Sequence, residues 1–148
     1  MPRVDVRMSP DQQSALLALP LTAALATLGL DGFPHQSAMW FVPEDGEVLM
    51  WTYAASQKSR NVERDPRASL LVEVGTAYRE LRGMAIQGEV EVIRDPELVR
   101  GIGLALHARY NIAPAAQALS AVNAQLPKRV GLRLPLTRVV SWDHRKLA

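Results

Sequence analysis

The sequence predicts a small, mainly β domain, in which an antiparallel barrel is flanked by helices. About six short strand signals follow one another along the chain, and tight turns join the early ones. Three of the first four links between strands are too short for a helix, which a parallel α/β sheet would need after nearly every strand. The few helical signals lie before and between the strands, as they do in small barrels with flanking helices.

The first element is a helix expected over about residues 10–19. Ser9 is the predicted N-cap, Pro10 occupies the first turn, and Gln12 stands where a capping box needs a side chain that returns to the N-cap. Pro20 ends the helix because proline cannot continue its hydrogen bonding.

Four strands are then expected over residues 23–30, 33–42, 47–53 and 68–74. Asp31-Gly32 joins the first two and is a strong short signal for a hairpin. Glu44-Asp45-Gly46 turns the chain into the third strand, and Gly75 closes the fourth.

A strand over residues 84–92 shows the clearest alternation, because apolar residues occupy its even-numbered positions and mostly polar ones its odd-numbered positions. Asp95-Pro96-Glu97 then opens a helix over about 95–109, and a third helix is expected over about 114–125. Alternation returns over 130–136, and a last strand begins at Val139. Without a repeat or a linker, we expect one domain over residues 1–148.

The composition excludes several classes of function. The chain has 148 residues and no cysteine, so it has no disulfide scaffold, thiolate-ligated metal or cysteine nucleophile. Its three histidines lack metal-ligand spacing, and we expect no metal site. A net charge of +2 argues against a dedicated nucleic-acid binder. With no membrane span and no apolar centre of a secretory signal in residues 1–13, a cytoplasmic protein is expected.

The segment from Thr52 to Asn61 carries the most chemistry. It leaves an apolar strand, opens a short helix, and gathers hydroxyl, amide and ammonium groups within ten residues: Thr52, Ser56, Gln57, Lys58 and Asn61. Helix N-termini also offer free N–H groups and a favourable dipole, so the segment suits a phosphate. The alternative is a serine N-cap followed by a solvated basic turn.

Several short stretches follow one another along the chain: Ala26-Thr27-Leu28, Asp31-Gly32-Phe33-Pro34, Trp40-Phe41, Gln57-Lys58-Ser59-Arg60-Asn61 and Asp65-Pro66-Arg67-Ala68-Ser69-Leu70. Together and in this order they resemble one known family, the split β-barrel flavin and deazaflavin proteins related to pyridoxamine 5'-phosphate oxidase. Residues 78–89 and 139–147 resemble a narrower branch, the reductases that use the deazaflavin coenzyme F420. The resemblance implies a six-stranded split barrel of the FMN-binding type.

The resemblance also implies a homodimer that holds its cofactor between subunits. Thr52, Gln57, Lys58 and Asn61 fall where the family binds the cofactor phosphate, and the strand Gln36-Ser37-Ala38-Met39-Trp40 falls where the ring lies. Tyr78 or Trp142 of the partner subunit would wall the acceptor pocket beside Met39 and Trp40. The flavin oxidases carry basic residues where this chain has Gln36 and Phe41, which favours deazaflavin over FMN.

The expected function is therefore an F420-dependent oxidoreductase that reduces a small electron-poor acceptor. Hydride transfer from a deazaflavin needs no catalytic triad, and no catalytic side chain is singled out. The alternatives are an FMN-dependent oxidase or reductase, a non-catalytic carrier of cofactor, haem or tetrapyrrole, and a dimeric domain without a working pocket. Arg60, Arg64 and Arg67 either contact the acidic tail of F420 or form a solvated face with Glu63 and Asp65.

Overall fold

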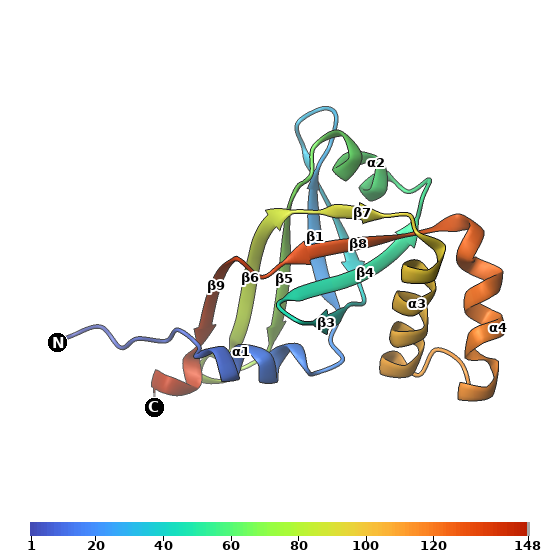
Figure 1. Ribbon diagram of the computed structural model, residues 1–148. Coiled ribbons are helices and arrows are strands. Elements are labelled where there is room, and N and C mark those ends of the chain that lie inside the picture. Colours follow the sequence, from blue (N-terminus) through green and yellow to red (C-terminus); the bar gives the residue numbers. More distant parts are fainter. Residues whose placement is uncertain (148) are drawn as a thin grey trace.

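The computed structural model describes residues 1–147, which form two antiparallel sheets and four α-helices (Figure 1). The five-stranded sheet has the order β2-β1-β5-β6-β9 and the four-stranded sheet the order β3-β4-β8-β7. The strands are β1 (Ala23–Leu28), β2 (Pro34–Met39), β3 (Val42–Glu44), β4 (Glu47–Tyr53), β5 (Arg67–Val74), β6 (Arg82–Glu89), β7 (Glu91–Ile93), β8 (Arg129–Pro135) and β9 (Arg138–Asp143).

The helices are α1 (Pro10–Leu17), α2 (Gln57–Arg64), α3 (Pro96–Tyr110) and α4 (Ala115–Gln125), with short 3-10 turns at Tyr78–Glu80, Leu126–Lys128 and His144–Leu147. The capping box forms at α1: Ser9 Oγ accepts a hydrogen bond from the Gln12 N–H at 3.2 Å, and Gln12 Oε1 accepts one from the Ser9 N–H at 2.8 Å. No helix within residues 1–147 is long and apolar enough to cross a bilayer.

Two of the seven stretches expected as strands divide, so residues 1–147 contain nine strands. The stretch 33–42 breaks at Trp40-Phe41 into β2 and β3, and the stretch 84–92 breaks at Val90 into β6 and β7. In both cases the two halves belong to different sheets. In the stretch 84–92 the apolar alternation continues through the break, and the stretch 33–42 has no alternation that could mark one, so the sequence pattern does not show where the chain changes sheet. Because the chain passes from one sheet to the other at these two points, the barrel is split, as the resemblance implied.

The core lies between the two sheets. Alternate residues of each strand point inward, as in β1, whose six residues are buried and half-buried in turn. The largest fully buried side chains of this core come from both sheets, from α1 and from the β2–β3 connection: Leu25, Met50, Leu70, Met84, Ile86, Leu132, Leu16 and Phe41. Full burial of such a side chain contributes about 1.5–3 kcal/mol each, so this core holds the two sheets in register.

The helices α3 and α4 lie side by side at one end of the molecule, away from β9 (Figure 1). Val99, Ile102 and Leu106 of α3 pack with Leu49 of β4 and Ile93 of β7 in a second apolar cluster. Asn111 ends α3 in the left-handed conformation, with φ of 52°. The helical pair thus stands against the four-stranded sheet and forms one side of a cleft.

Candidate functional site

A cleft of about 770 Å³ lies between the α3–α4 pair and the ends of β2 and β4. This volume is in the range of small-molecule pockets, about 300–1,000 Å³. Its lining is largely apolar and aromatic, with cationic side chains at one end: Thr22, Ala38, Met39, Trp40, Trp51, Tyr53, Lys58, Leu106, His107, Ile112, Ala113, Ala121, Gln125 and Arg129. A mostly apolar cleft with few polar groups suits a largely aromatic ligand that carries an anionic group.

The cationic end is formed by Lys58 of α2 and Arg129 of β8. Lys58 Nζ donates to Thr52 Oγ1 at 3.3 Å, and Arg129 Nε donates to Gln125 Oε1 at 3.2 Å. Within residues 1–147, neither side chain forms an ion pair with a carboxylate. Two unneutralised cations therefore share one end of the cleft, and an anion there would relieve their repulsion.

The pKa values of Lys58 and Arg129 are both lowered, because their surroundings disfavour the charged forms. Burial lowers the pKa of Lys58 below its ordinary value, and the nearby Arg129 charge lowers it further. Burial also lowers the pKa of Arg129. Both charged groups have thus lost part of their hydration without gaining a carboxylate partner. A phosphate bound between them would supply the missing negative charge.

The beginning of α2 positions Lys58. Ser56 is the N-cap, and its Oγ accepts a hydrogen bond from the Ser59 N–H at 3.3 Å. Thr52 Oγ1 and Ser56 Oγ lie 3.3 Å apart, so the end of β4 and the beginning of α2 are joined. Thr52, expected as a phosphate ligand, is buried and lies behind Lys58 rather than on the cleft surface.

The amides of Asn61 and Gln57, which the sequence places beside the cofactor phosphate, contact other residues of the chain. Asn61 is fully buried, and its Nδ2 donates to Thr27 Oγ1 of β1 at 3.0 Å. Its Oδ1 accepts from Gln57 Nε2 at 2.7 Å and from Arg64 Nη2 at 3.3 Å. Asn61 lies against β1, Gln57 is exposed one turn before it, and Lys58 is turned toward the cleft. The Asn61 amide therefore attaches α2 to the five-stranded sheet, and Gln57 supports that amide.

The strand expected to lie along the cofactor ring is divided between two surfaces. Ala38, Met39 and Trp40 line the cleft. Gln36 and Ser37 line a shallower cavity on the outer face of the five-stranded sheet, which Ala38 also borders. Since β2 is an edge strand, its outer backbone groups have no partner strand and are available to a ligand.

Trp142 belongs to β9, which lies on the far side of the molecule from α3 and α4 (Figure 1), and the 3-10 turn of Tyr78 contacts the turn that follows β9. The Tyr78 ring packs on His144 with 4.6 Å between centroids, and Trp142 covers Gly83, where a Cβ would stand 2.5 Å from the indole. Within one chain, neither residue lines the cleft. The expectation that they wall the acceptor pocket therefore requires a partner subunit.

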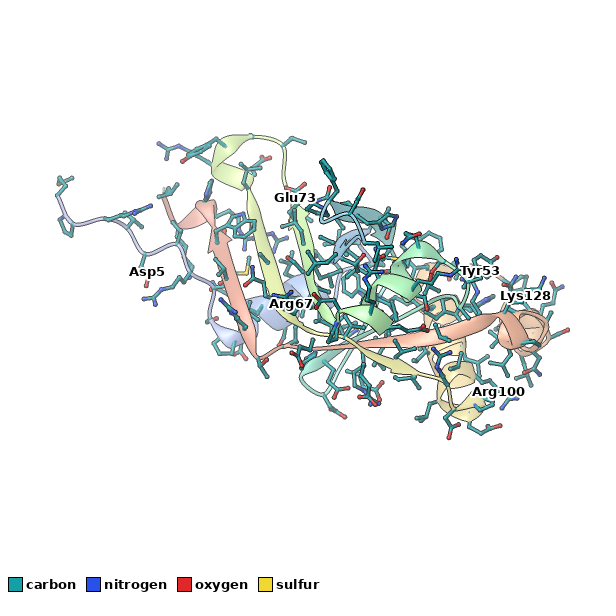
Figure 2. All side chains as sticks on the ribbon, turned by 90° about the horizontal axis from the view of Figure 1, so that it is seen from above. Asp5, Tyr53, Arg67, Glu73, Arg100 and Lys128 are labelled. Atoms are coloured by element: carbon teal, nitrogen blue, oxygen red, sulfur yellow. The ribbon has the colours of Figure 1, made fainter. Side chains whose placement is uncertain are left out.

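Two of the three arginines considered for the F420 tail are engaged within the chain. Arg64 Nη2 donates to the Leu28 carbonyl at 2.5 Å, and Arg67 pairs with Asp65 at 2.6 Å. Figure 2 shows Arg67 well away from Tyr53, which lines the cleft. Arg60, Arg64 and Arg67 are all exposed, so exposure does not separate the tail hypothesis from a solvated face.

The cleft residues that sequence reasoning did not assign to the site include Arg129, Trp51 and His107. The Arg129 guanidinium lies 4.6 Å from the Trp51 ring centroid and 3.8 Å from that of Tyr53. Arg129 pairs with Tyr53 only because β8 runs antiparallel beside β4, and this pairing joins residues 76 positions apart in the chain (129 − 53). Nothing in the sequence distinguishes Trp51 and His107 from ordinary packing residues.

Comparison with known proteins gives the chain a clear set of relatives. The family model described as pyridoxamine 5'-phosphate oxidase matches residues 9–143. A conserved hypothetical protein, Rv2991 from Mycobacterium tuberculosis, is 39% identical with a TM-score of 0.90, over 99% of this chain and 92% of that one. A protein titled F420 reductase is 27% identical with a TM-score of 0.67, over 86% of this chain and 94% of that one.

A more distant likeness concerns the fold alone. HutZ, described as a heme storage protein from Vibrio cholerae, is 18% identical with a TM-score of 0.70, over 92% of this chain and 95% of that one. None of the curated proteins matches the chain. The same barrel thus occurs in proteins whose names refer to different ligands, so the ligand must be argued from the site.

Proposed function

Because the chain belongs to the pyridoxamine 5'-phosphate oxidase family, we propose that it is an oxidoreductase that binds F420 and passes a hydride to a small electron-poor organic acceptor. The observation that carries the proposal is the pair Lys58 and Arg129, two partly buried cations without a carboxylate at one end of a largely apolar cleft. The relative titled F420 reductase supports the deazaflavin among the cofactors of such barrels.

The donor set fits a phosphorylated tricyclic cofactor. Lys58 and Arg129 would hold the phosphate through charge-assisted hydrogen bonds, and Ala38 and Met39 at the end of β2, with Trp40 after it, would lie along the ring. Trp40 and Trp51 would limit water at the ring. When bound, reduced F420 supplies a hydride to the acceptor, which then takes one proton from solvent. The chain's own task is to bind, orient and exclude water.

We infer F420 rather than FMN because two positions at the ends of β2 carry no positive charge. Gln36 is neutral, and Phe41 is fully buried in the core, so neither adds a cation at the ends of β2. The phosphate is thus left to Lys58 and Arg129 alone. An FMN enzyme on the same barrel is the main alternative, and a flavin spectrum in the purified protein would select it.

Turnover distinguishes an enzyme from a carrier. We expect the protein to oxidise reduced F420 in the presence of menadione or cyclohex-2-enone, with the reaction followed by the return of F420 fluorescence. Tight binding of F420 without hydride transfer to either acceptor would indicate a carrier. No binding at all would contradict the proposal.

We also propose that the protein is a homodimer formed through the outer face of the five-stranded sheet. One apolar row crosses this face through all five strands, in the paired positions Ala38, Ala24, Leu71, Ala85 and Val140. Leu71 is 39% exposed and Val140 66% exposed, which leaves apolar surface for a second copy to cover. Because Ala38 borders both this face and the cleft, residues of a second copy would reach the cleft.

Leu71→Lys is expected to shift the protein from dimer to monomer, because it places a charge at the centre of the apolar row. Light scattering coupled to size-exclusion chromatography measures the mass directly. Leu98→Lys is the matched control, since Leu98 is an exposed leucine on α3 outside this face, and it should leave the mass unchanged. A monomeric parent protein, or a Leu71→Lys variant that stays dimeric, would contradict this interface.

The affinity for F420 is expected to fall in alkaline solution. Burial and Arg129 lower the pKa of Lys58 below its ordinary value of 10.5, and only the protonated amine attracts the phosphate. Binding is therefore complete below this lowered pKa and weakens as the pH rises through it. Calorimetric titration between about pH 7 and 10 measures the effect, and Lys58→Arg should remove most of it because arginine keeps its charge in this range. Equal pH profiles for the two proteins would contradict the assignment.

A further inference from the structure

Two aromatic rings of β4 contact the guanidinium of Arg129. Trp51 and Tyr53 are alternate residues of this strand, so their side chains lie on the same face of the sheet. Arg129 is the first residue of β8 and is paired with Tyr53 in the sheet. Its Cζ lies 3.8 Å from the Tyr53 ring centroid and 4.6 Å from the Trp51 ring centroid. Both distances are within the range of a cation–π interaction, so the two rings hold the same charge.

A third contact limits the rotation of this guanidinium. Arg129 Nε donates to Oε1 of Gln125, the last residue of α4, at 3.2 Å. Because the guanidinium is planar, holding Nε at Gln125 and Cζ over the rings leaves the group little freedom to turn. Within residues 1–147, its Nη1 and Nη2 donate no hydrogen bond and form no ion pair. The two outer nitrogens are therefore available to a ligand in the cleft.

The Trp51 ring is itself held in place by α3. A Cβ at Gly103 would stand 2.6 Å from Trp51 Cζ3 and 2.9 Å from Trp51 Cη2, closer than such atoms pack. The indole therefore lies directly on the backbone of α3, where only glycine leaves room for it. Such close packing fixes the position of the ring, and the ring in turn fixes one side of the Arg129 site.

Tyr53 differs from Trp51 because much of its ring is in contact with solvent. The residue is 47% exposed, and its ring lines the cleft beside Arg129. Neighbouring residues of the same strand, Met50 and Thr52, are buried. Replacing Tyr53 therefore removes a contact with Arg129 without opening the core.

Lys58 completes the cationic end of the cleft. Its Nζ donates to Thr52 Oγ1 at 3.3 Å, and Thr52 lies between Trp51 and Tyr53 in β4. Three consecutive residues of one strand thus contact both cations. The lysine supplies a compact charge, whereas the guanidinium supplies N–H groups in a planar fork that matches two oxygens of one anion.

We propose that Trp51 and Tyr53 are positioning residues: they hold Arg129 as a fixed, two-pronged donor that, with Lys58, binds a tetrahedral oxyanion such as a phosphate group. A side chain that is already immobilised loses less freedom when the ligand binds, and this raises the affinity. That the phosphate belongs to F420 rests on the proposed function. The anion site does not, because inorganic phosphate tests it without any cofactor.

The test follows the Arg129 Nε–H signal in NMR spectra of the ¹⁵N-labelled full chain, assigned with Arg129→Lys. We expect the ring currents of Trp51 and Tyr53 to shift this proton away from the other arginines, and inorganic phosphate at constant ionic strength to move it saturably. Tyr53→Leu should reduce the ring-current shift and weaken phosphate binding about threefold to tenfold, the cost of immobilising one long side chain. Tyr53→Phe keeps the ring and should recover both.

Arg129→Lys separates the geometry of the fork from its charge. Phosphate binding to this variant is followed by the Trp51 indole N–H signal, assigned with Trp51→Phe. The variant keeps the positive charge but loses the planar fork, so it should bind phosphate at least as weakly as Tyr53→Leu does. If Arg129→Lys bound phosphate as tightly as the parent protein, charge alone would explain the site and the proposal would be overturned.

The melting temperature distinguishes positioning from a general structural role. Because Tyr53 is so exposed, Tyr53→Leu should leave the melting temperature nearly unchanged while it weakens phosphate binding. A purely structural Tyr53 would show the opposite pattern, with a lower melting temperature and an unchanged phosphate affinity. That pattern would overturn the proposal.

Two glycine substitutions on α3 test the contribution of Trp51. Gly103→Ala should displace the indole, move the Arg129 signal and weaken phosphate binding roughly threefold or more, because the new methyl group overlaps the ring. Gly101→Ala is the matched control, since a Cβ there meets nothing within 4 Å, and it should change neither. Equal effects of the two substitutions would contradict the role of Trp51.

Titration with F420 separates this proposal from the proposed function. If phosphate binding follows the expected series but F420 does not bind, the proposed function fails and the positioning of Arg129 stands. If F420 binds and Tyr53→Leu leaves its affinity unchanged, the positioning role fails and the proposed function stands.

Discussion

Replacing Lys58 with alanine is expected to weaken F420 binding about tenfold to a hundredfold, the effect of losing a charge-assisted hydrogen bond worth roughly 1.5–3 kcal/mol. Arg129→Ala should lose a similar amount, because its guanidinium lines the same end of the cleft. Calorimetric titration of each variant with F420 measures both effects. The double variant should lose more than either single variant, since the remaining cation still attracts the phosphate.

The control for this series is Arg60→Ala. Arg60 lies two residues beyond Lys58 on α2 but is exposed and does not line the cleft. Its removal should change affinity by no more than about threefold, the weak effect of a distant exposed charge. If Arg60→Ala matched Lys58→Ala, the effect would come from overall charge rather than from a phosphate site.

Asn61→Ala is expected to lower the free energy of unfolding by roughly 2–4 kcal/mol, because it leaves the buried Thr27 hydroxyl without its partner and creates a small cavity. Asn61 is fully buried, and its amide joins α2 to β1. For a chain of this length, the loss corresponds to a fall of roughly 4–16 °C in melting temperature. Differential scanning calorimetry without ligand measures it.

Gln57→Ala offers the comparison. Gln57 donates to the same Asn61 oxygen but is exposed, so water replaces the lost hydrogen bond and the melting temperature should fall by much less. An Asn61→Ala protein that is as stable as the parent protein but does not bind F420 would indicate that Asn61 binds the phosphate. That result would contradict the role that its contacts indicate.

The local signals of the sequence predicted the elements well. Ser9 and Ser56 cap α1 and α2 with the expected hydrogen bonds. The strands that cross from one sheet to the other could not be divided in advance. At Trp40-Phe41 and at Val90, the breaks are set by distant partners: Tyr110 Oη binds the Phe41 backbone, and the Val90 N–H donates to Pro66. The hydrophobic periodicity of a strand gives no information about such distant partners.

The part of the site that is built by residues close together in the sequence could be predicted. Lys58 lies on the cleft because the turn from β4 into α2 places it there, and this turn is readable from residues 52–61. The direction in which α2 packs is not readable, so the burial of Asn61 against β1 could not be predicted. Arg129 and His107 enter the cleft through β8 and α3, whose positions depend on sheet pairing and helix packing.

The most direct test of the account is a parallel titration of F420 and FMN into the purified protein, followed by fluorescence, and repeated with Lys58→Ala combined with Arg129→Ala. We expect saturable binding of F420, weaker binding of FMN, and loss of F420 binding by about a hundredfold or more in the double variant. Unchanged F420 affinity in the double variant, or tighter binding of FMN than of F420 by the parent protein, would contradict the proposal that these two cations anchor a deazaflavin.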